Sequence, residues 1–163
     1  MDTTRGPLHI VQPGDAPSYW QPVPANGFVE VHVAPGLVAM ETPFGLGRQH
    51  VAPGCYVRAH SHDRNEELIH VISGEGRAVI DGAEHPMRPG TSFFLGRNIV
   101  HSFINEGGED LVFLWLLTPN GLEDFFQAIG RPRHAGEPAP EPFPRPADVF
   151  AIERRTVFAP PPA

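Results

Sequence analysis

The stretch GCYVRAHSHDRNEE, residues 54–67, carries two histidines and a carboxylate at spacings typical of a metal site. His60 and His62 are separated by one residue, so on a β-strand, where side chains alternate between faces, both imidazoles point the same way. Glu67 follows after a short turn and can return to that face from the next strand, and His101 can add a third imidazole from a separate strand. Imidazole and carboxylate ligands suit Fe, Mn, Ni, Cu, Co or Zn. The pattern therefore predicts a divalent transition-metal site with positions left open for substrate or O2.

Short β-rich runs surround this stretch, and pairs such as Pro53-Gly54, Asp81-Gly82 and Pro89-Gly90 separate them as turns. The predicted strands are 28–33, 37–41, 48–51, 56–60, 68–73, 77–81, 91–95, 99–104 and 111–118. Many short strands with Gly/Pro turns predict an all-β sandwich or barrel of antiparallel sheets.

The ligand spacing resembles the cupin superfamily. Its first motif is matched at Gly54, His60, His62, Glu67 and Gly74. Its second is matched at Gly90, His101 and Asn105, whereas Gly96 and Asn98 stand where the family has Pro and Gly. The resemblance covers about residues 31–118 and implies a double-stranded β-helix (cupin jelly-roll barrel), with His60, His62, Glu67 and His101 as metal ligands. Arms like those of this chain pair two barrels in similar proteins, which implies a homodimer.

Three regions are expected: an irregular N-terminal arm over 1–27, the barrel over 28–119, and a C-terminal helix with a Pro-rich tail over 120–163. Leu122, Phe125, Phe126 and Ile129 form an apolar stripe at helical spacing, which predicts a helix that docks on the barrel. A second short helix over 147–155 would bury its apolar residues, Val149, Phe150 and Ile152. The aromatic core is predicted to contain Phe93, Phe94, Phe103, Phe113 and Trp115.

Composition and charge argue against several classes of function. The chain has 163 residues and a formal charge of −7, which argues against nucleic-acid and anionic-membrane partners because both require clustered cations. A single cysteine excludes an internal disulfide framework. The first residues lack the pattern of a signal peptide, and no run approaches the ~18 apolar residues of a membrane span. We expect a cytoplasmic protein with a small-molecule substrate.

Several residues near the ligands are candidates for roles in catalysis. Arg58 and Tyr56 share the strand face of His60, and Arg58 is suited to a substrate carboxylate or enolate, with an internal salt bridge as the alternative. Glu67 is preferred over the adjacent Glu66 as the ligand, because it has the motif spacing. Glu67 is also a candidate base for a substrate hydroxyl.

The resemblance implies a metal-dependent dioxygenase that acts on a small enolic, phenolic or diketone-like substrate, with Fe(II) as the favoured ion. Two alternatives stay open. One is non-redox chemistry, in which the ion polarises a carbonyl for an isomerase, decarboxylase or lyase. The other is a barrel that binds a small molecule without catalysis.

Overall fold

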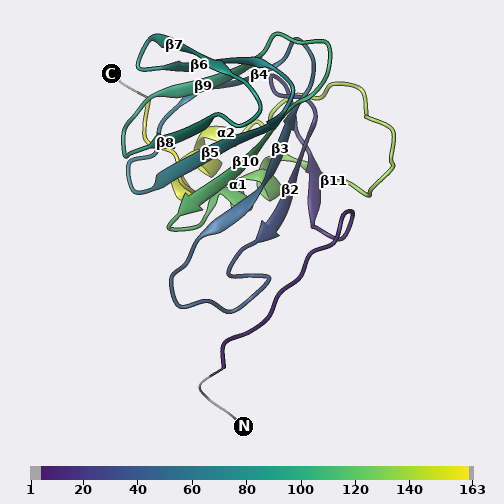
Figure 1. Cartoon of the computed structure of the whole chain (residues 1–163), viewed down its shortest axis with the longest axis vertical. Helices are drawn as coiled ribbons and strands as arrows, with labels where there is room; N and C mark the ends of the chain where they lie inside the picture. The colour runs from purple at the N-terminus through teal and green to yellow at the C-terminus, as the bar shows by residue number, and fades with distance from the viewer. Residues whose placement is uncertain (1–4, 162–163) are drawn as a thin grey trace.

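The structure is a computed structural model that describes residues 5–161. The first four residues of the predicted arm and the last two of the predicted tail lie outside the described residues. Two antiparallel sheets face each other, with strand orders β11-β1-β2-β3-β10-β5-β8 and β4-β9-β6-β7 (Figure 1). The strands are β1 Ser18–Trp20, β2 Phe28–Val33, β3 Gly45–Val51, β4 Tyr56–His60, β5 Glu66–Ser73, β6 Gly76–Ile80, β7 Ala83–Met87, β8 Ser92–Leu95, β9 His101–Asn105, β10 Leu111–Thr118 and β11 Arg131–Pro132. The predicted all-β double-stranded β-helix with short C-terminal helices is confirmed.

Side-chain alternation on β5 shows how the sequence sets the inner face of the barrel. Glu67, Ile69 and Val71 are buried, whereas Glu66 and Leu68 are exposed. This period of two is the signature of a strand with one face toward a core. The same alternation therefore packs apolar side chains between the sheets and places one carboxylate among them.

Two residues that the sequence motifs single out have structural roles. Asn105 is buried, and its Nδ2 donates to the carbonyl oxygens of Val51 and Glu109 while its Oδ1 accepts from the Gly107 N–H. A fully satisfied buried amide of this kind fixes the loops it bridges. Gly74 has a φ of 78°, and a Cβ there would lie 2.4 Å from the Asp110 carbonyl oxygen, so only glycine fits.

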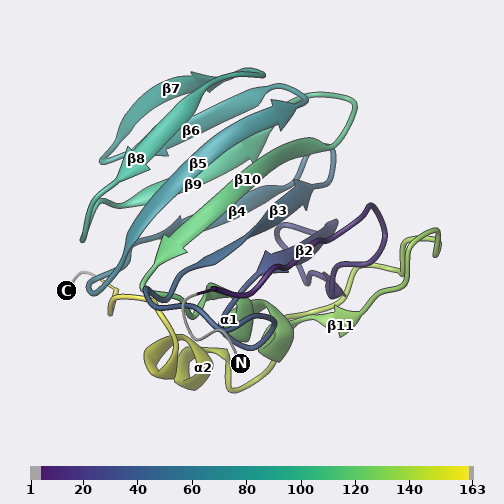
Figure 2. The ribbon, with the colours of Figure 1, turned by 60° about the horizontal axis from the view of Figure 1, so that its bottom comes forward.

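Two helices, α1 Leu122–Ile129 and α2 Val149–Arg155, lie together on one side of the barrel (Figure 2). The predicted apolar stripe of α1 is buried, and Gly130 caps the C-terminal end of the helix. The Glu123 carboxylate accepts hydrogen bonds from the Gly121 N–H and from Asn120 Nδ2, so it satisfies groups at the helix start. No helix among residues 5–161 is long and apolar enough to cross a membrane.

The structure departs from the sequence prediction at several elements. Residues 37–41 form turns rather than a strand, in a loop flanked by Gly36 and Pro43. The predicted irregular arm contributes β1, which pairs with β2 and with β11. Phe94 and Phe150 were expected in the interior but are 69% and 61% exposed. Each side chain lies on the outer face of its strand or helix, so the prediction placed these two residues on the wrong face.

Candidate metal centre

Four side chains from both sheets converge on one point inside the barrel. His60 ends β4, His62 follows in the next loop, Glu67 lies on β5, and His101 begins β9 directly opposite His60. One ligand atom from each residue lies within 4.8 Å of all the others. His62, Glu67 and His101 are 3%, 3% and 1% exposed. The structure thus brings together all four predicted ligands.

Backbone carbonyls fix the tautomer of each histidine. The Nδ1 atoms of His60, His62 and His101 each lie 2.8 Å from a backbone carbonyl oxygen, which can only accept. Each Nδ1 must therefore carry the hydrogen, and each Nε2 keeps its lone pair. The acceptors are the carbonyl oxygens of Arg58, Val157 and Ile99, in that order. This arrangement is the usual way in which proteins orient metal-binding imidazoles.

The inward-facing atoms lack an internal partner and so fit a cation. Glu67 Oε2 lies 3.0 Å from His101 Nε2 and 3.5 Å from His62 Nε2. With Nδ1 protonated, these contacts place lone pairs against lone pairs, and among the described residues all three atoms are buried without a hydrogen-bond partner. Buried polar atoms of this kind cost free energy unless something neutralises them. The donor set of three imidazoles and a carboxylate matches a divalent transition-metal ion.

Burial and the neighbouring ligands shift the pKa values of the residues in this centre in opposite directions. Burial would raise the pKa of Glu67, but His101 and His62 outweigh it and hold the pKa well below its ordinary range. Burial, with the neighbouring imidazoles of His101 and His62, lowers the pKa of His60. For His62, burial alone would lower the pKa, but the interaction with Glu67 outweighs it and raises the pKa. Glu67 is therefore ionised, and His62 is where a proton competes with a cation.

Metal affinity should fall on acidification for this reason. Binding requires His62 to lose its proton. Because the pKa of His62 is raised, affinity begins to fall at a pH above the ordinary histidine pKa of about 6.5, and it falls further as the pH drops. We expect affinity to drop by about tenfold or more between pH 7.5 and 5.5. Isothermal titration with zinc across this range checks the prediction, and an affinity unchanged at pH 5.5 would contradict the ligand assignment.

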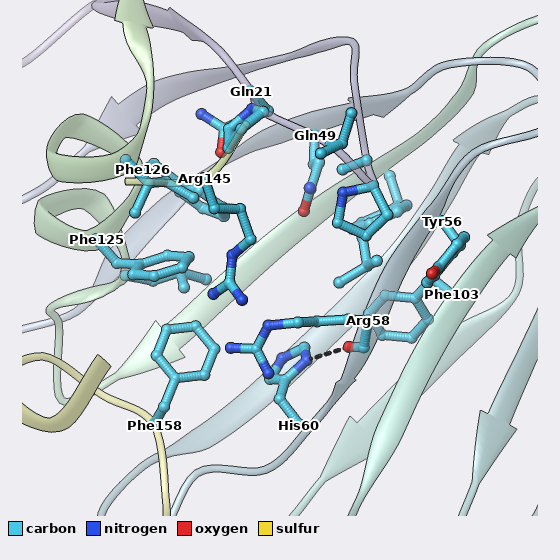
Figure 3. A pocket seen from close by; sticks show the side chains of 18 of the residues that line it. Gln21, Gln49, Tyr56, Arg58, His60, Phe103, Phe125, Phe126, Arg145 and Phe158 are labelled. Carbon is cyan, nitrogen blue, oxygen red and sulfur yellow. Dashed lines mark hydrogen bonds between the residues drawn. The ribbon is translucent and has the colours of Figure 1, made fainter. Parts of the chain in front are cut away.

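A small cavity opens beside the centre. It encloses about 70 Å³, well below the roughly 300 Å³ at which drug-sized pockets begin. His60 and Glu67 reach it, so two of the four ligands face the space where a ligand would enter. Figure 3 shows the aromatic wall that faces His60. Its apolar members include Phe103, Phe113, Leu122, Phe125, Phe126 and Phe158.

Arg58 and Tyr56 line the cavity together with His60, but so does Val57 between them, and an irregularity in the pairing of β4 with β9 between Val57 and His60 interrupts the alternation. Tyr56 is 46% exposed at its rim, and Arg58 pairs with Glu153 of α2, so the internal salt bridge weighed from the sequence is present. Glu66 lies outside.

Sequence reasoning missed three residues beside the centre: Arg145, Glu153 and Phe158. Arg145 lies in the Pro-rich segment, where no spacing indicates a site. Phe158 belongs to an isolated apolar pair with Val157, which is a weak sign of burial. Its ring lies 5.1 Å from His60 and 5.2 Å from His62, measured between ring centroids. The C-terminal segment therefore forms part of the wall around the ligands.

Comparison with known proteins identifies the architecture. Residues 47–117 match the family model described as "Cupin domain". The oxalate-binding protein of Thermotoga maritima is 33% identical over 69 residues, which are 42% of this chain and 57% of that protein. Polyketide synthase CurC of Streptomyces cyaneus is 27% identical over 74 residues, 45% of this chain and 48% of that protein.

The polyketide cyclase RemF of Streptomyces resistomycificus has a similar fold, with a TM-score of 0.60 and 21% identity over 69% of this chain and 80% of RemF. The match spans about half the length of the curated relatives. Arg145, Glu153 and Phe158 lie beyond the residues that the family model covers.

Proposed function

We propose that the chain, whose residues 47–117 match the cupin domain, is a metal-dependent enzyme of the cupin superfamily, a dioxygenase for a small enolic, phenolic or diketone-like substrate. The observation that carries the proposal is the cluster His60, His62, Glu67 and His101 at the wall of a mostly apolar cavity. Four protein ligands leave positions free on an ion that prefers six. A divalent ion held there would act as a Lewis acid and, if redox-active, would exchange electrons with O2.

The names of the relatives support this class of substrate. One relative is named for binding oxalate, and others are a polyketide synthase and a polyketide cyclase. Oxalate and polyketides share closely spaced oxygen atoms, which can donate in pairs to one ion. An enol or 1,3-diketone presents the same pair of oxygens on an apolar body, and the aromatic wall suits that body.

The residues around the cavity have different proposed roles in binding the ion and the substrate. Glu67 serves first as a ligand, because its lowered pKa makes it a weak base in the metal-free centre. Arg58 presents a guanidinium to the cavity and would stabilise negative charge on the substrate. Tyr56, at the rim, would contact the substrate as it enters. The aromatic side chains exclude water from the reacting atoms.

Non-redox chemistry is the second candidate, favoured by the likeness to a protein named as a cyclase. The same ligands would then hold an ion that polarises a carbonyl, and no O2 would be consumed. A third possibility is binding without catalysis, and one relative is named for binding oxalate. A protein of this kind would show neither turnover nor O2 uptake.

Oxygen uptake separates the two catalytic candidates. We expect the Fe(II)-loaded protein to consume O2 in equal amount to substrate from a panel of small 1,3-diketones, enols and phenols, and the zinc-loaded protein to consume none. Substrate turnover by the zinc form without O2 uptake would replace the dioxygenase by the non-redox candidate. No turnover with any ion would leave a binding protein.

We also propose that the chain forms a homodimer through its outer apolar surface. Leu8 and Ile10 of the N-terminal arm are 80% and 67% exposed, and Phe94 on β8 is exposed beside Leu68 on β5. The adjacent exposed pair Phe94 and Leu68 is the kind of surface that a second chain can cover, and the exposed arm is a further candidate contact. Light scattering after size exclusion should give twice the mass of one chain, and the mass of a single chain at 100 µM (about 2 mg/mL) would contradict the proposal.

A further inference from the structure

Two guanidinium groups meet in the wall of the metal cavity. Arg58 comes from β4, and Arg145 comes from the segment between β11 and α2, far away in the sequence. Both side chains line the cavity, and their guanidinium groups point toward each other near the His60 ring (Figure 3). Two cations placed so closely in a partly buried site repel each other, and they remain together only when anions offset the repulsion.

One carboxylate of the protein supplies part of that offset. Nη2 of Arg58 and Nη2 of Arg145 both donate to Oε1 of Glu153, whose side chain is 10% exposed. Glu153 does not line the cavity; it borders a separate hollow on the other side of Arg58, beside Phe150 and Ala159. The carboxylate thus accepts from Nη2 of both arginines, and Nη1 of Arg58 donates to the Ala59 carbonyl oxygen, so the remaining donors of Arg145 are the ones most open to a ligand.

The charges around the cavity balance only while the centre holds no ion. The guanidinium groups of Arg58 and Arg145 face the carboxylates of Glu153 and Glu67, and burial together with the charge of Arg145 lowers the pKa of Arg58. A divalent ion at the centre would leave an excess of positive charge. With that excess, in a protein whose formal charge is −7, the cavity would concentrate small anions rather than cations.

We propose that Arg58 and Arg145 form a binding site for a carboxylate group of the ligand that occupies the cavity. The inference rests on the proposed function only in taking this cavity as the ligand site. Guanidinium forks match the two oxygens of a carboxylate, with charge-assisted hydrogen bonds about twice as strong as neutral ones. The ligand class is therefore a small carboxylic acid with an apolar or aromatic body, which the wall around Phe103, Phe125 and Phe126 would enclose.

A purely structural role would look different. If the two arginines served only to tie α2 to the barrel through Glu153, replacing Arg145 would lower stability but leave binding of small molecules unchanged. Selectivity for a carboxylate over a neutral molecule of the same shape separates the two roles, because a change in fold or cavity volume would affect both molecules alike.

Benzoate and benzamide are such a pair, and the full chain freed of metal with EDTA prevents either from binding through the ion. We expect the wild-type chain to bind benzoate at least about tenfold more tightly than benzamide in an NMR titration. Arg145→Gln and Arg58→Gln should each lower benzoate affinity by about tenfold and leave benzamide affinity unchanged. Arg145→Lys, which keeps the charge without the fork, should lie between.

Arg77→Gln is the matched control, because Arg77 also pairs with two carboxylates, Glu84 and Glu106, but outside the cavity. It should bind benzoate as the wild type does. Equal affinities for the two probes, no benzoate binding at about 10 mM, or equal losses for both probes in Arg145→Gln would overturn the inference. Metal content of the same proteins tests the proposed function separately: a wild-type chain that takes up no metal but prefers benzoate would sink that function alone.

Discussion

Replacement of His101 by alanine is expected to lower the affinity for Fe(II) or Zn(II) by more than about a hundredfold. Loss of a group that merely supports a metal ligand costs roughly 10- to 100-fold, and loss of a ligand costs more. His101 is almost completely buried, and its Nε2 faces Glu67 Oε2 at 3.0 Å, so no solvent-exposed group nearby can take its place. Competition with a chromophoric chelator measures the affinity.

His70→Ala is the control for this substitution. His70 also lies on a strand of the barrel, but its Nδ1 contacts the Ser92 hydroxyl outside the metal cluster. Its removal should leave the affinity within about twofold of the wild type. Circular dichroism of both metal-free variants verifies that they fold. An affinity of His101→Ala close to that of His70→Ala would show that the imidazole is not a ligand.

Replacement of Phe158 by alanine is expected to lower the free energy of unfolding of the metal-free protein by about 3–5 kcal/mol, as for other buried phenylalanines. Phe158 is 6% exposed and packs on Phe125 of α1, with 4.4 Å between ring centroids, as well as on the ring of His60. Its loss would open the cavity wall and loosen the Val157 carbonyl that orients His62. Urea denaturation in EDTA measures the change.

The same C-terminal segment offers a matched comparison in Phe150. This residue is 61% exposed, so Phe150→Ala should change the free energy of unfolding by less than about 0.5 kcal/mol. Similar values for the two variants would mean that Phe158 is not packed in the barrel wall. The account of the C-terminal segment as part of the metal centre would then be wrong.

The metal cluster could be predicted because the cupin motifs fix the spacing of its ligands, His101 included. A strand period alone does not explain His60 and His62, since β4 ends at His60 and His62 lies in the loop that follows. The motif distance from Glu67 to Gly74 distinguishes Glu67 from Glu66. Strand alternation also predicted Arg58 and Tyr56 beside the cavity; both line it, and so does Val57 between them. The apolar stripe of α1 likewise has a spacing that the sequence displays.

Other parts of the site depend on contacts between distant segments. Arg145 lies in a Pro-rich segment with no periodicity, and only the fold brings it to Arg58 and Glu153. The acceptor for the His62 ring is a backbone carbonyl, at Val157, which no side-chain pattern marks. Short pairings such as β1 with β11 also escaped prediction, because two or three residues carry too little pattern to indicate a strand.

Elemental mass spectrometry on the full chain, reconstituted with Fe(II) without oxygen and then desalted, tests the central claim most directly. The account predicts about one equivalent of metal per chain, and close to none when His62 and His101 are both replaced by alanine. Absence of bound metal in the wild type after reconstitution with Fe(II), Mn(II), Ni(II), Cu(II), Co(II) and Zn(II) in turn would contradict it. So would an equal metal content in the wild type and the double variant.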